Sequence, residues 1–186
     1  ILNVVFVLLD LSFTLRNKAK DKSKSKVIAA TVERKMHLQG RIMTENVLNE
    51  IKWYHNLNKM AEKGNIVFAG STFVQNFPIQ ELERNFCVEQ NVYNRGIAGL
   101  TLSDFKESLT ACIYDLAPSK IFLNIGEEDV KTSNFNEVFF VTDYLQIIKG
   151  IKKQLPQVKM YVIGILPTAN GYKEINKTLQ HAVCGC

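Results

Sequence analysis

Two hydroxyl side chains, Ser71 and Thr72, directly follow a short apolar stretch and a glycine. Residues 66–69 are Ile-Val-Phe-Ala, and Gly70 ends the run. Four apolar residues bounded by turn-forming residues predict a buried strand. Ligands of open α/β sheets bind at the carboxyl ends of the strands, so this spacing places both hydroxyls where a nucleophile would act.

Two later segments carry groups that would complete such chemistry. Residues 96–99 begin and end with glycines, Gly96 and Gly99, which let the backbone turn sharply and bring its amides close to a ligand. Residues 126–129 are Gly-Glu-Glu-Asp and supply carboxylates. In acyl transfer a hydroxyl attacks a carbonyl carbon while amide donors stabilise the oxyanion that develops. The three segments together predict a site for acyl chemistry.

Apolar runs and helical periodicity alternate along the chain and predict the elements that would position these groups. We expect strands at residues 66–69, 87–93, 121–125 and 158–165, and helices at 101–113, 134–155 and 172–183. Asn134 is the expected cap of the long helix. Such alternation favours an α/β fold with a mostly parallel sheet. Three strands that end in small, polar or acidic residues then place the three segments along one sheet edge.

The first 62 residues differ in composition from the rest. Residues 1–15 are mostly apolar, and residues 16–26 carry six basic side chains against one acid. We therefore expect three regions: an apolar segment with a basic linker (1–26), a helical segment (27–62) and the main domain (63–186). In the helical segment, Trp53 and Tyr54 are expected to pack, and His37 and His55 to lie at the surface.

The positive charge is concentrated in one segment. The formal net charge is +5, and without residues 16–26 the chain is near neutral, which argues against a nucleic-acid partner. Residues 1–15 are too short and too interrupted for a confident spanning helix. We expect a cytoplasmic protein, with membrane association through the N-terminal segment as the alternative.

The cysteines do not follow a metal or disulfide pattern. Cys87 and Cys112 are scattered, and Cys184 and Cys186 form a close pair without a second pair or a histidine cluster. We expect free thiols in a reducing compartment, no metal and no other cofactor.

Four blocks of sequence carry a resemblance to a known family. They are residues 66–72 followed by Phe77-Pro78, residues 93–101, residues 118–129, and residues 165–168 followed by Ile175-Asn176. In this order they resemble the SGNH (GDSL-type) hydrolases, esterases and acylhydrolases, and look closest to small bacterial members similar to platelet-activating-factor acetylhydrolase subunits. The resemblance covers about residues 54–179. It implies a flavodoxin-like three-layer α/β/α sandwich, here without the family's last strand and helix, and a small acyl-ester, acylated-sugar or lipid ligand.

The departures from this family fall on its catalytic positions. Thr72 stands at the position of the family's nucleophilic serine, and Ser71 stands one residue earlier as an alternative hydroxyl. The amides of Thr72 and Gly99 would hold the oxyanion. Glu128, followed by Asp129, replaces an asparagine that donates to the oxyanion in the family. A carboxylate donates no hydrogen bond, and losing one such donor typically lowers the rate by about two to three orders of magnitude.

The family's base, in an Asp-x-x-His motif, has no match in this chain. His181 is the remaining candidate for that role, although it falls within the expected last helix. Without a base a threonine hydroxyl is a poor nucleophile at neutral pH. We therefore expect an ester hydrolase by ancestry with impaired or absent activity, a pseudoenzyme. The alternatives are a non-catalytic acyl- or carbohydrate-binding module and a truncated gene product, whose open sheet edge would favour a homodimer.

Overall fold

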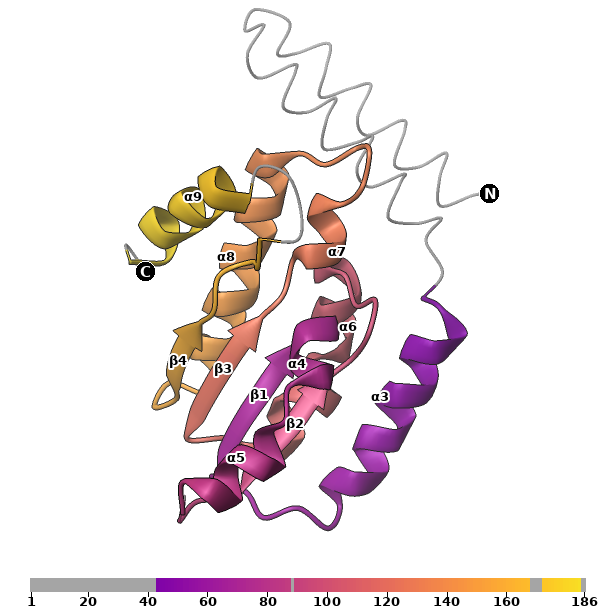
Figure 1. Ribbon diagram of the computed structural model, residues 1–186, viewed down its shortest axis with the longest axis vertical. Helices are drawn as coiled ribbons and strands as arrows, with labels where there is room; N and C mark the ends of the chain where they lie inside the picture. The colour runs from indigo at the N-terminus through magenta and orange to yellow at the C-terminus, as the bar shows by residue number, and fades with distance from the viewer. Residues whose placement is uncertain (1–42, 88, 168–171, 185–186) are drawn as a thin grey trace, which may run out of the picture. The chain divides into compact units, whose positions relative to one another are not determined.

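The computed structural model describes residues 43–87, 89–167 and 172–184 (Figure 1). Its four strands are parallel and form one sheet in the order β2-β1-β3-β4. The strands are β1 (Ile66–Gly70), β2 (Val92–Gly96), β3 (Lys120–Asn124) and β4 (Lys159–Val162). The prediction of an α/β fold with a parallel sheet is confirmed.

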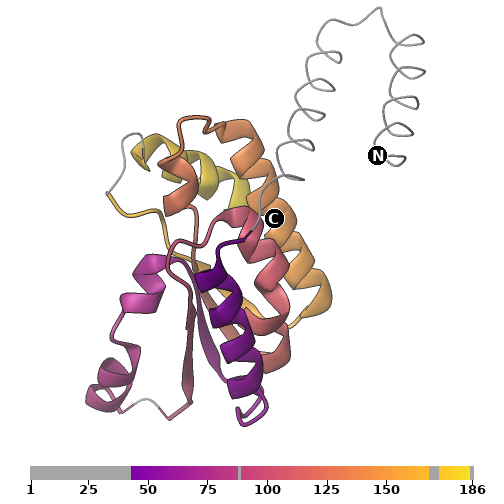
Figure 2. The ribbon, with the colours of Figure 1, turned by 90° about the vertical axis from the view of Figure 1, so that its right-hand side faces the viewer.

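Helices cover both faces of the sheet, so the described residues form three layers, as a flavodoxin-like sandwich does (Figure 2). In Figure 2, α3, α6 and α8 lie on one side of the sheet and α4 and α5 on the other, while α9 packs on α8. The helices are α3 (Glu45–Asn58), α4 (Thr72–Asn76), α5 (Ile79–Asn85), α6 (Leu102–Cys112), the 3-10 helix η1 (Tyr114–Leu116), α7 (Glu127–Val130), α8 (Glu137–Gln154) and α9 (Tyr172–Cys184).

The two faces of the sheet are packed to different degrees. Side chains alternate between the faces along a strand, and Val67, Ile121 and Leu123 are fully buried in the core that includes α6 and α8. On the other face, Phe68 and Phe122 are only half-buried, and their rings stack with centroids 4.5 Å apart.

Side-chain caps fix the starts of two long helices. At α6, the hydroxyl of Thr101 accepts a hydrogen bond from the Asp104 amide at 3.3 Å. At α8, the prediction of Asn134 as the cap is wrong. Asn136 occupies that position, and its side-chain oxygen accepts from the Phe139 amide at 3.2 Å.

Two strands are shorter or later than predicted. β2 begins at Val92 and not at residue 87, because Cys87 has a left-handed φ of 47° that turns the chain there. β4 ends at Val162 and not at residue 165. The Asn124 side chain donates to the carbonyls of residues 163 and 164, at 3.3 and 2.9 Å, so these groups bond a side chain and not a neighbouring strand.

One packing prediction in α3 is confirmed and the other is wrong. Tyr54 is buried against the core, whereas Trp53 is 58% exposed. The two neighbours point in different directions because consecutive residues on a helix lie on different faces. α3 packs on α6 and η1 within the unit formed by the residues from Met43 onward.

Several predictions fall outside the described residues. The apolar and basic segments of residues 1–26, His37 and Cys186 are among them, and the domain boundaries at 26 and 62 stay predictions. Within the described part of the chain, no helix is both long enough and apolar enough to span a membrane.

Candidate functional site

The turn after β1 brings the two hydroxyl residues to the carboxyl edge of the sheet. Gly70 has a φ of 152°, and a Cβ atom there would lie 1.8 Å from the carbonyl oxygen of Asn124 on β3. The next amide, that of Ser71, donates to this same oxygen at 3.0 Å. Only glycine permits this close approach, so Gly70 sets the direction in which the following side chains point.

Thr72 and Gly99, two of the predicted site positions, are in direct contact. The amide of Gly99 donates a hydrogen bond to Oγ1 of Thr72 at 3.1 Å. Gly99 has a φ of 72°, a left-handed conformation that suits glycine. The Thr72 side chain is half-buried at the first position of α4. The hydroxyl and the amide therefore share one small region at the strand ends.

Ser71, the neighbouring hydroxyl residue, is in a different environment from Thr72. Its side chain is fully buried, and Oγ has no hydrogen-bond partner among the described residues. A buried hydroxyl of this kind cannot meet a ligand at the surface. The structure therefore gives no support to Ser71 as an alternative nucleophile.

The acidic segment forms α7 and is held by local contacts. Asp129 accepts a hydrogen bond from the Leu102 amide at 2.9 Å, which ties α7 to the start of α6. The Glu128 carboxylate accepts from Lys131 Nζ at 3.2 Å, and the Glu127 carboxylate accepts from the same amine at 2.8 Å. These hydrogen bonds, that to Glu127 first, raise the pKa of Lys131. The Glu128 side chain is thus a hydrogen-bond acceptor paired with a cation and offers no donor to a ligand.

The two described histidines lie away from Thr72. His55 Nδ1 lies 2.8 Å from Asp115 Oδ2, in the η1 turn that leads into the start of β3, at the opposite edge of the sheet. His181 is exposed on α9, which both views place beside α8 and away from α4 (Figures 1 and 2). Among the described residues, no histidine stands beside the Thr72 hydroxyl.

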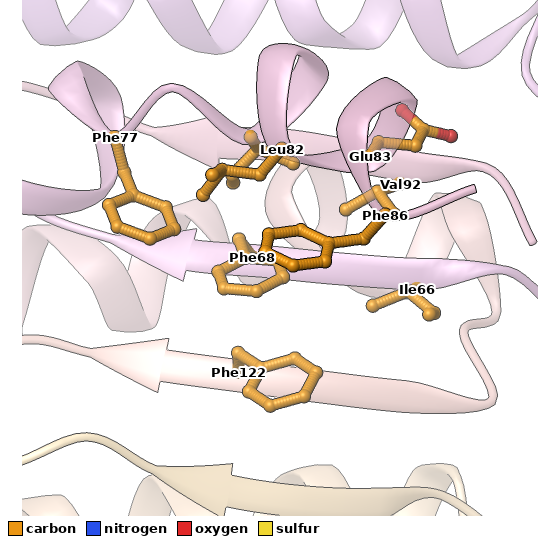
Figure 3. A pocket seen from close by; sticks show the side chains of 9 residues that line it. Ile66, Phe68, Phe77, Leu82, Glu83, Phe86, Val92 and Phe122 are labelled. Atoms are coloured by element: carbon orange, nitrogen blue, oxygen red, sulfur yellow. The ribbon is translucent and has the colours of Figure 1, made fainter. Parts of the chain in front are cut away.

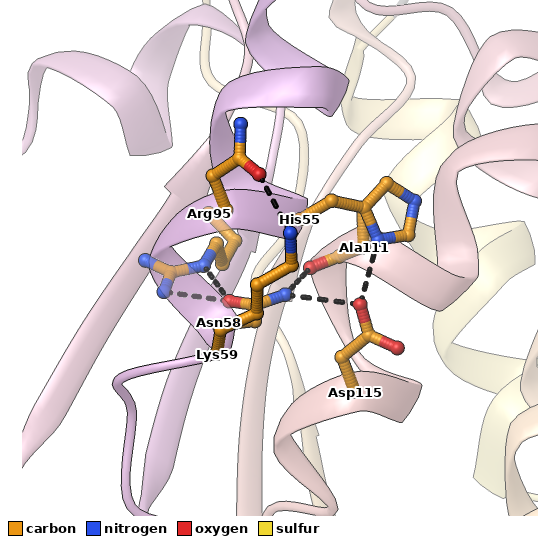
Figure 4. Close-up of polar contacts among 7 residues, drawn as sticks. His55, Asn58, Lys59, Arg95, Ala111 and Asp115 are labelled. Carbon is orange, nitrogen blue, oxygen red and sulfur yellow. Dashed lines mark hydrogen bonds and ion pairs between the residues drawn. The ribbon is translucent and has the colours of Figure 1, made fainter.

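A buried arginine network holds α3 against β2 and was not expected from the sequence (Figure 4). Arg95 is 5% exposed, and its guanidinium stacks on Tyr54 and Tyr93 with centroid distances of 4.9 and 5.4 Å. It donates to Oδ1 of Asn58 through two nitrogens, at 3.0 and 2.8 Å. Desolvation by burial lowers the pKa of Arg95. Arg95 lies beyond the predicted strand of residues 87–93, and no local sequence pattern marks it as buried.

This network fixes the strand end that precedes Gly99. The Tyr54 hydroxyl donates to the Gly96 carbonyl, and the Asn94 side chain donates to the Val74 carbonyl of α4 at 2.7 Å. At Gly96 a Cβ would lie 2.2 Å from the Gln75 amide nitrogen. The close contact between β2 and α4 therefore positions the Gly99 loop against the start of α4.

Solved structures that share this fold include several hydrolases. A platelet activating factor protein from Streptococcus pneumonia matches with a TM-score of 0.67 and 23% identity, over 86% of this chain and 77% of that one. A GDSL-like lipase from Bacteroides thetaiotaomicron matches with a TM-score of 0.54 and 18% identity, over 73% of this chain and 70% of that one. A lipase/acylhydrolase from Enterococcus faecalis matches with a TM-score of 0.56 and 19% identity, over 67% of this chain and 72% of that one. No family model and no curated protein matches. The chain has the fold of the GDSL-like lipases and acylhydrolases.

Proposed function

We propose that this chain binds the carbonyl group of an acyl ester at Thr72 and Gly99 and hydrolyses it slowly or not at all. The carrying observation is the 3.1 Å hydrogen bond from the Gly99 amide to Thr72 Oγ1. It shows a hydroxyl and an amide donor within reach of one ligand atom. A carbonyl oxygen that displaced the threonine hydroxyl from this amide would lie where an oxyanion develops during acyl transfer.

The altered residues around this pair argue for weak chemistry. The described histidines, His55 and His181, lie elsewhere, so the Thr72 hydroxyl keeps its proton at neutral pH and is a poor nucleophile. Glu128 is bonded to Lys131 and supplies no donor. A negative charge at this position opposes the charge that develops on the carbonyl oxygen. Together these features favour an impaired ester hydrolase, a pseudoenzyme of the fold.

The second candidate is a binding module for an acylated sugar or lipid, with no turnover. The buried Ser71 hydroxyl and the paired Glu128 favour it, because neither can take part in catalysis. An acetyl xylan esterase shares the fold, with a TM-score of 0.54 and 16% identity. An acylated carbohydrate is therefore a reasonable ligand to include in a binding screen.

Hydrolysis of p-nitrophenyl acetate tests the proposal. We expect the wild-type protein to stay within about tenfold of background, and Thr72→Ala to remove any excess. Thr142→Ala is the matched control, since this exposed threonine lies on α8 away from the site. His181→Ala should also leave the rate unchanged.

Two outcomes decide between the candidates. Turnover that Thr72→Ala abolishes and Thr142→Ala retains would identify a working threonine nucleophile. Equal background rates, combined with thermal stabilisation by esters that Thr72→Ala weakens, would support the binding module. No stabilisation by any ester or acyl sugar would overturn the proposed carbonyl site.

A further inference from the structure

An apolar pocket opens between α5 and the sheet (Figure 3). Its volume is about 220 Å³. Phe68 and Phe122 form its wall on the sheet. Leu82 of α5 and Phe86, the residue after α5, form the opposite wall. Glu83 is the one charged side chain that lines it in the described part of the chain.

Several apolar lining residues are more exposed than side chains of this size in the core, whereas Ile66 and Ile79 are buried. Phe86 is 74% exposed, and Phe68, Leu82 and Phe122 are half-buried. Large apolar side chains gathered around an open volume are typical of ligand sites. A cavity of about 150 Å³ with similar lining stays dry and holds a benzene molecule, so this pocket fits an apolar group of about eight to ten carbons.

One end of the pocket lies beside the end of β1 from which the Thr72 turn departs. Phe77 lines the pocket and follows α4, whose first residue is Thr72. Its ring lies 6.0 Å from that of Phe68 and 5.4 Å from that of Phe73. In Figure 3 Phe77 lies beside the arrowhead of β1, the strand end from which the Thr72 turn departs. A chain in the pocket would therefore point one end toward Thr72.

The charges around the pocket indicate that its ligand is an ester and not a free fatty acid. With Glu83 at the rim and no lysine or arginine among the described residues that line the pocket, a free carboxylate is disfavoured inside it. We propose that the pocket binds the aliphatic chain of a medium-chain acyl ester, with the chain along Phe68 and the ester group at Thr72. The inference rests on the proposed function for the ester group, while the pocket itself binds the chain.

Binding of methyl octanoate and methyl butyrate to the full chain, measured by calorimetry, tests this assignment. The octanoate should bind on the order of a hundredfold more tightly, because each buried methylene adds roughly fourfold in affinity. Leu82→Trp fills the pocket and should reduce this ratio to below about tenfold. Leu48→Trp is the matched control, because Leu48 is an exposed leucine on α3 outside the pocket. Circular dichroism confirms that both variants fold.

The variants separate failure of the pocket from failure of the proposed function. A ratio near one in the wild type, or a ratio that Leu82→Trp leaves unchanged, would overturn the pocket. Thr72→Ala should weaken both esters equally and keep their ratio. If the octanoate still binds more tightly than the butyrate and Thr72→Ala changes neither affinity, the chain-binding pocket is supported and the proposed carbonyl site is wrong. Self-association that only Leu82→Trp abolishes, without competition by the octanoate, would reassign the pocket to a second copy of the chain.

Discussion

The adjacent hydroxyls of Ser71 and Thr72 meet opposite environments. The Thr72 oxygen accepts from a backbone amide at the sheet edge, whereas the Ser71 oxygen is buried without a partner in the described residues. A one-residue shift along the chain therefore decides which hydroxyl a ligand can reach. This is why the position of a hydroxyl in the motif matters as much as its presence.

Tyr144 and Tyr54 provide a matched pair for the cost of a buried hydroxyl. The Tyr144 hydroxyl is fully buried and has no partner among the described residues, while that of Tyr54 donates to the Gly96 carbonyl. We expect Tyr144→Phe to leave the free energy of unfolding unchanged or raise it by about 1 kcal/mol, and Tyr54→Phe to lower it by about 1–2 kcal/mol. Urea denaturation of both variants measures the difference. An equal loss of unfolding free energy in the two variants would show that the Tyr144 hydroxyl has a hydrogen-bond partner.

The sequence predicted that Thr72 and Gly99 lie at one edge of the sheet, but neither the hydrogen bond between them nor the residues that support it. Both positions follow strands, and parallel strand ends meet at one edge, so their proximity follows from topology. The Arg95–Asn58 bond joins residues 37 positions apart through the packing of α3 on the sheet. A helix's place on a sheet depends on side-chain packing that local patterns do not encode.

At the scale of elements, α3 is fastened by polar contacts as well as by its apolar side. Asn58 accepts from Arg95 and donates to the carbonyl of Ala111 at 2.7 Å. It also donates to Asp115, which His55 contacts from the next turn of the helix. The helix thus connects the end of β2 with the end of α6.

Asn58→Ala tests this role of α3. The change leaves the buried Arg95 guanidinium without its acceptor, so we expect a loss of about 2–4 kcal/mol in the free energy of unfolding. Asn56→Ala is the matched control on the same helix, because Asn56 is exposed and bonds only Lys59 among the contacts the structure gives it. It should cost less than about 0.5 kcal/mol. Similar urea midpoints for the two variants would contradict the role assigned to the network.

The ends of strands were the least predictable feature of the elements. Apolar runs indicate which residues are buried, and all four strands overlap their predicted ranges. The ends depend on which groups bond the backbone. After β4, the Asn176 side chain accepts from the Ile165 amide and donates to its carbonyl, both at 2.8 Å. Residues 163–165 are apolar or small, but the carbonyls of all three accept hydrogen bonds from asparagine side chains, which a hydropathy pattern cannot show.

At the scale of the whole molecule, a buried thiol and a buried phenol make the free energy of unfolding depend on pH in the alkaline range. Burial raises the pKa of the Cys112 thiol from 9.0 to about 12 and raises the pKa of the Tyr144 phenol. Both groups ionise more readily in the unfolded chain. Their contribution to stability is therefore complete below about pH 9 and is lost as the pH rises toward the folded-state pKa values.

Urea denaturation under reducing conditions at pH 8 and pH 10.5 measures this loss. We expect the wild type to lose about 2 kcal/mol through Cys112 and about 1 kcal/mol through Tyr144 over this range. Cys112→Ala should be less stable at pH 8 but lose less on going to pH 10.5. Cys87→Ala, at an exposed thiol, should keep the wild-type slope. Identical slopes in all three proteins would rule out the buried thiol as a cause.

The sheet has β4 as an outer strand among those described, since β4 pairs with β3 alone. Tyr161 of this strand is 47% exposed, and its ring stacks on that of Phe122 with centroids 4.8 Å apart. An exposed outer strand can pair with another chain. The expected homodimer stays a prediction, and sedimentation of the full chain tests it.

The exposure of Trp53 has a practical consequence for such measurements. Trp53 is the only tryptophan in the chain and lies on the solvent side of α3. Its indole is surrounded largely by water before unfolding as well as after it, so the wavelength of its fluorescence emission will shift little when the core opens. The fluorophore reports on what touches α3 from outside. Quenching of Trp53 by an added protein or vesicle would therefore detect a partner at α3, while the folded fraction has to be followed by a backbone signal.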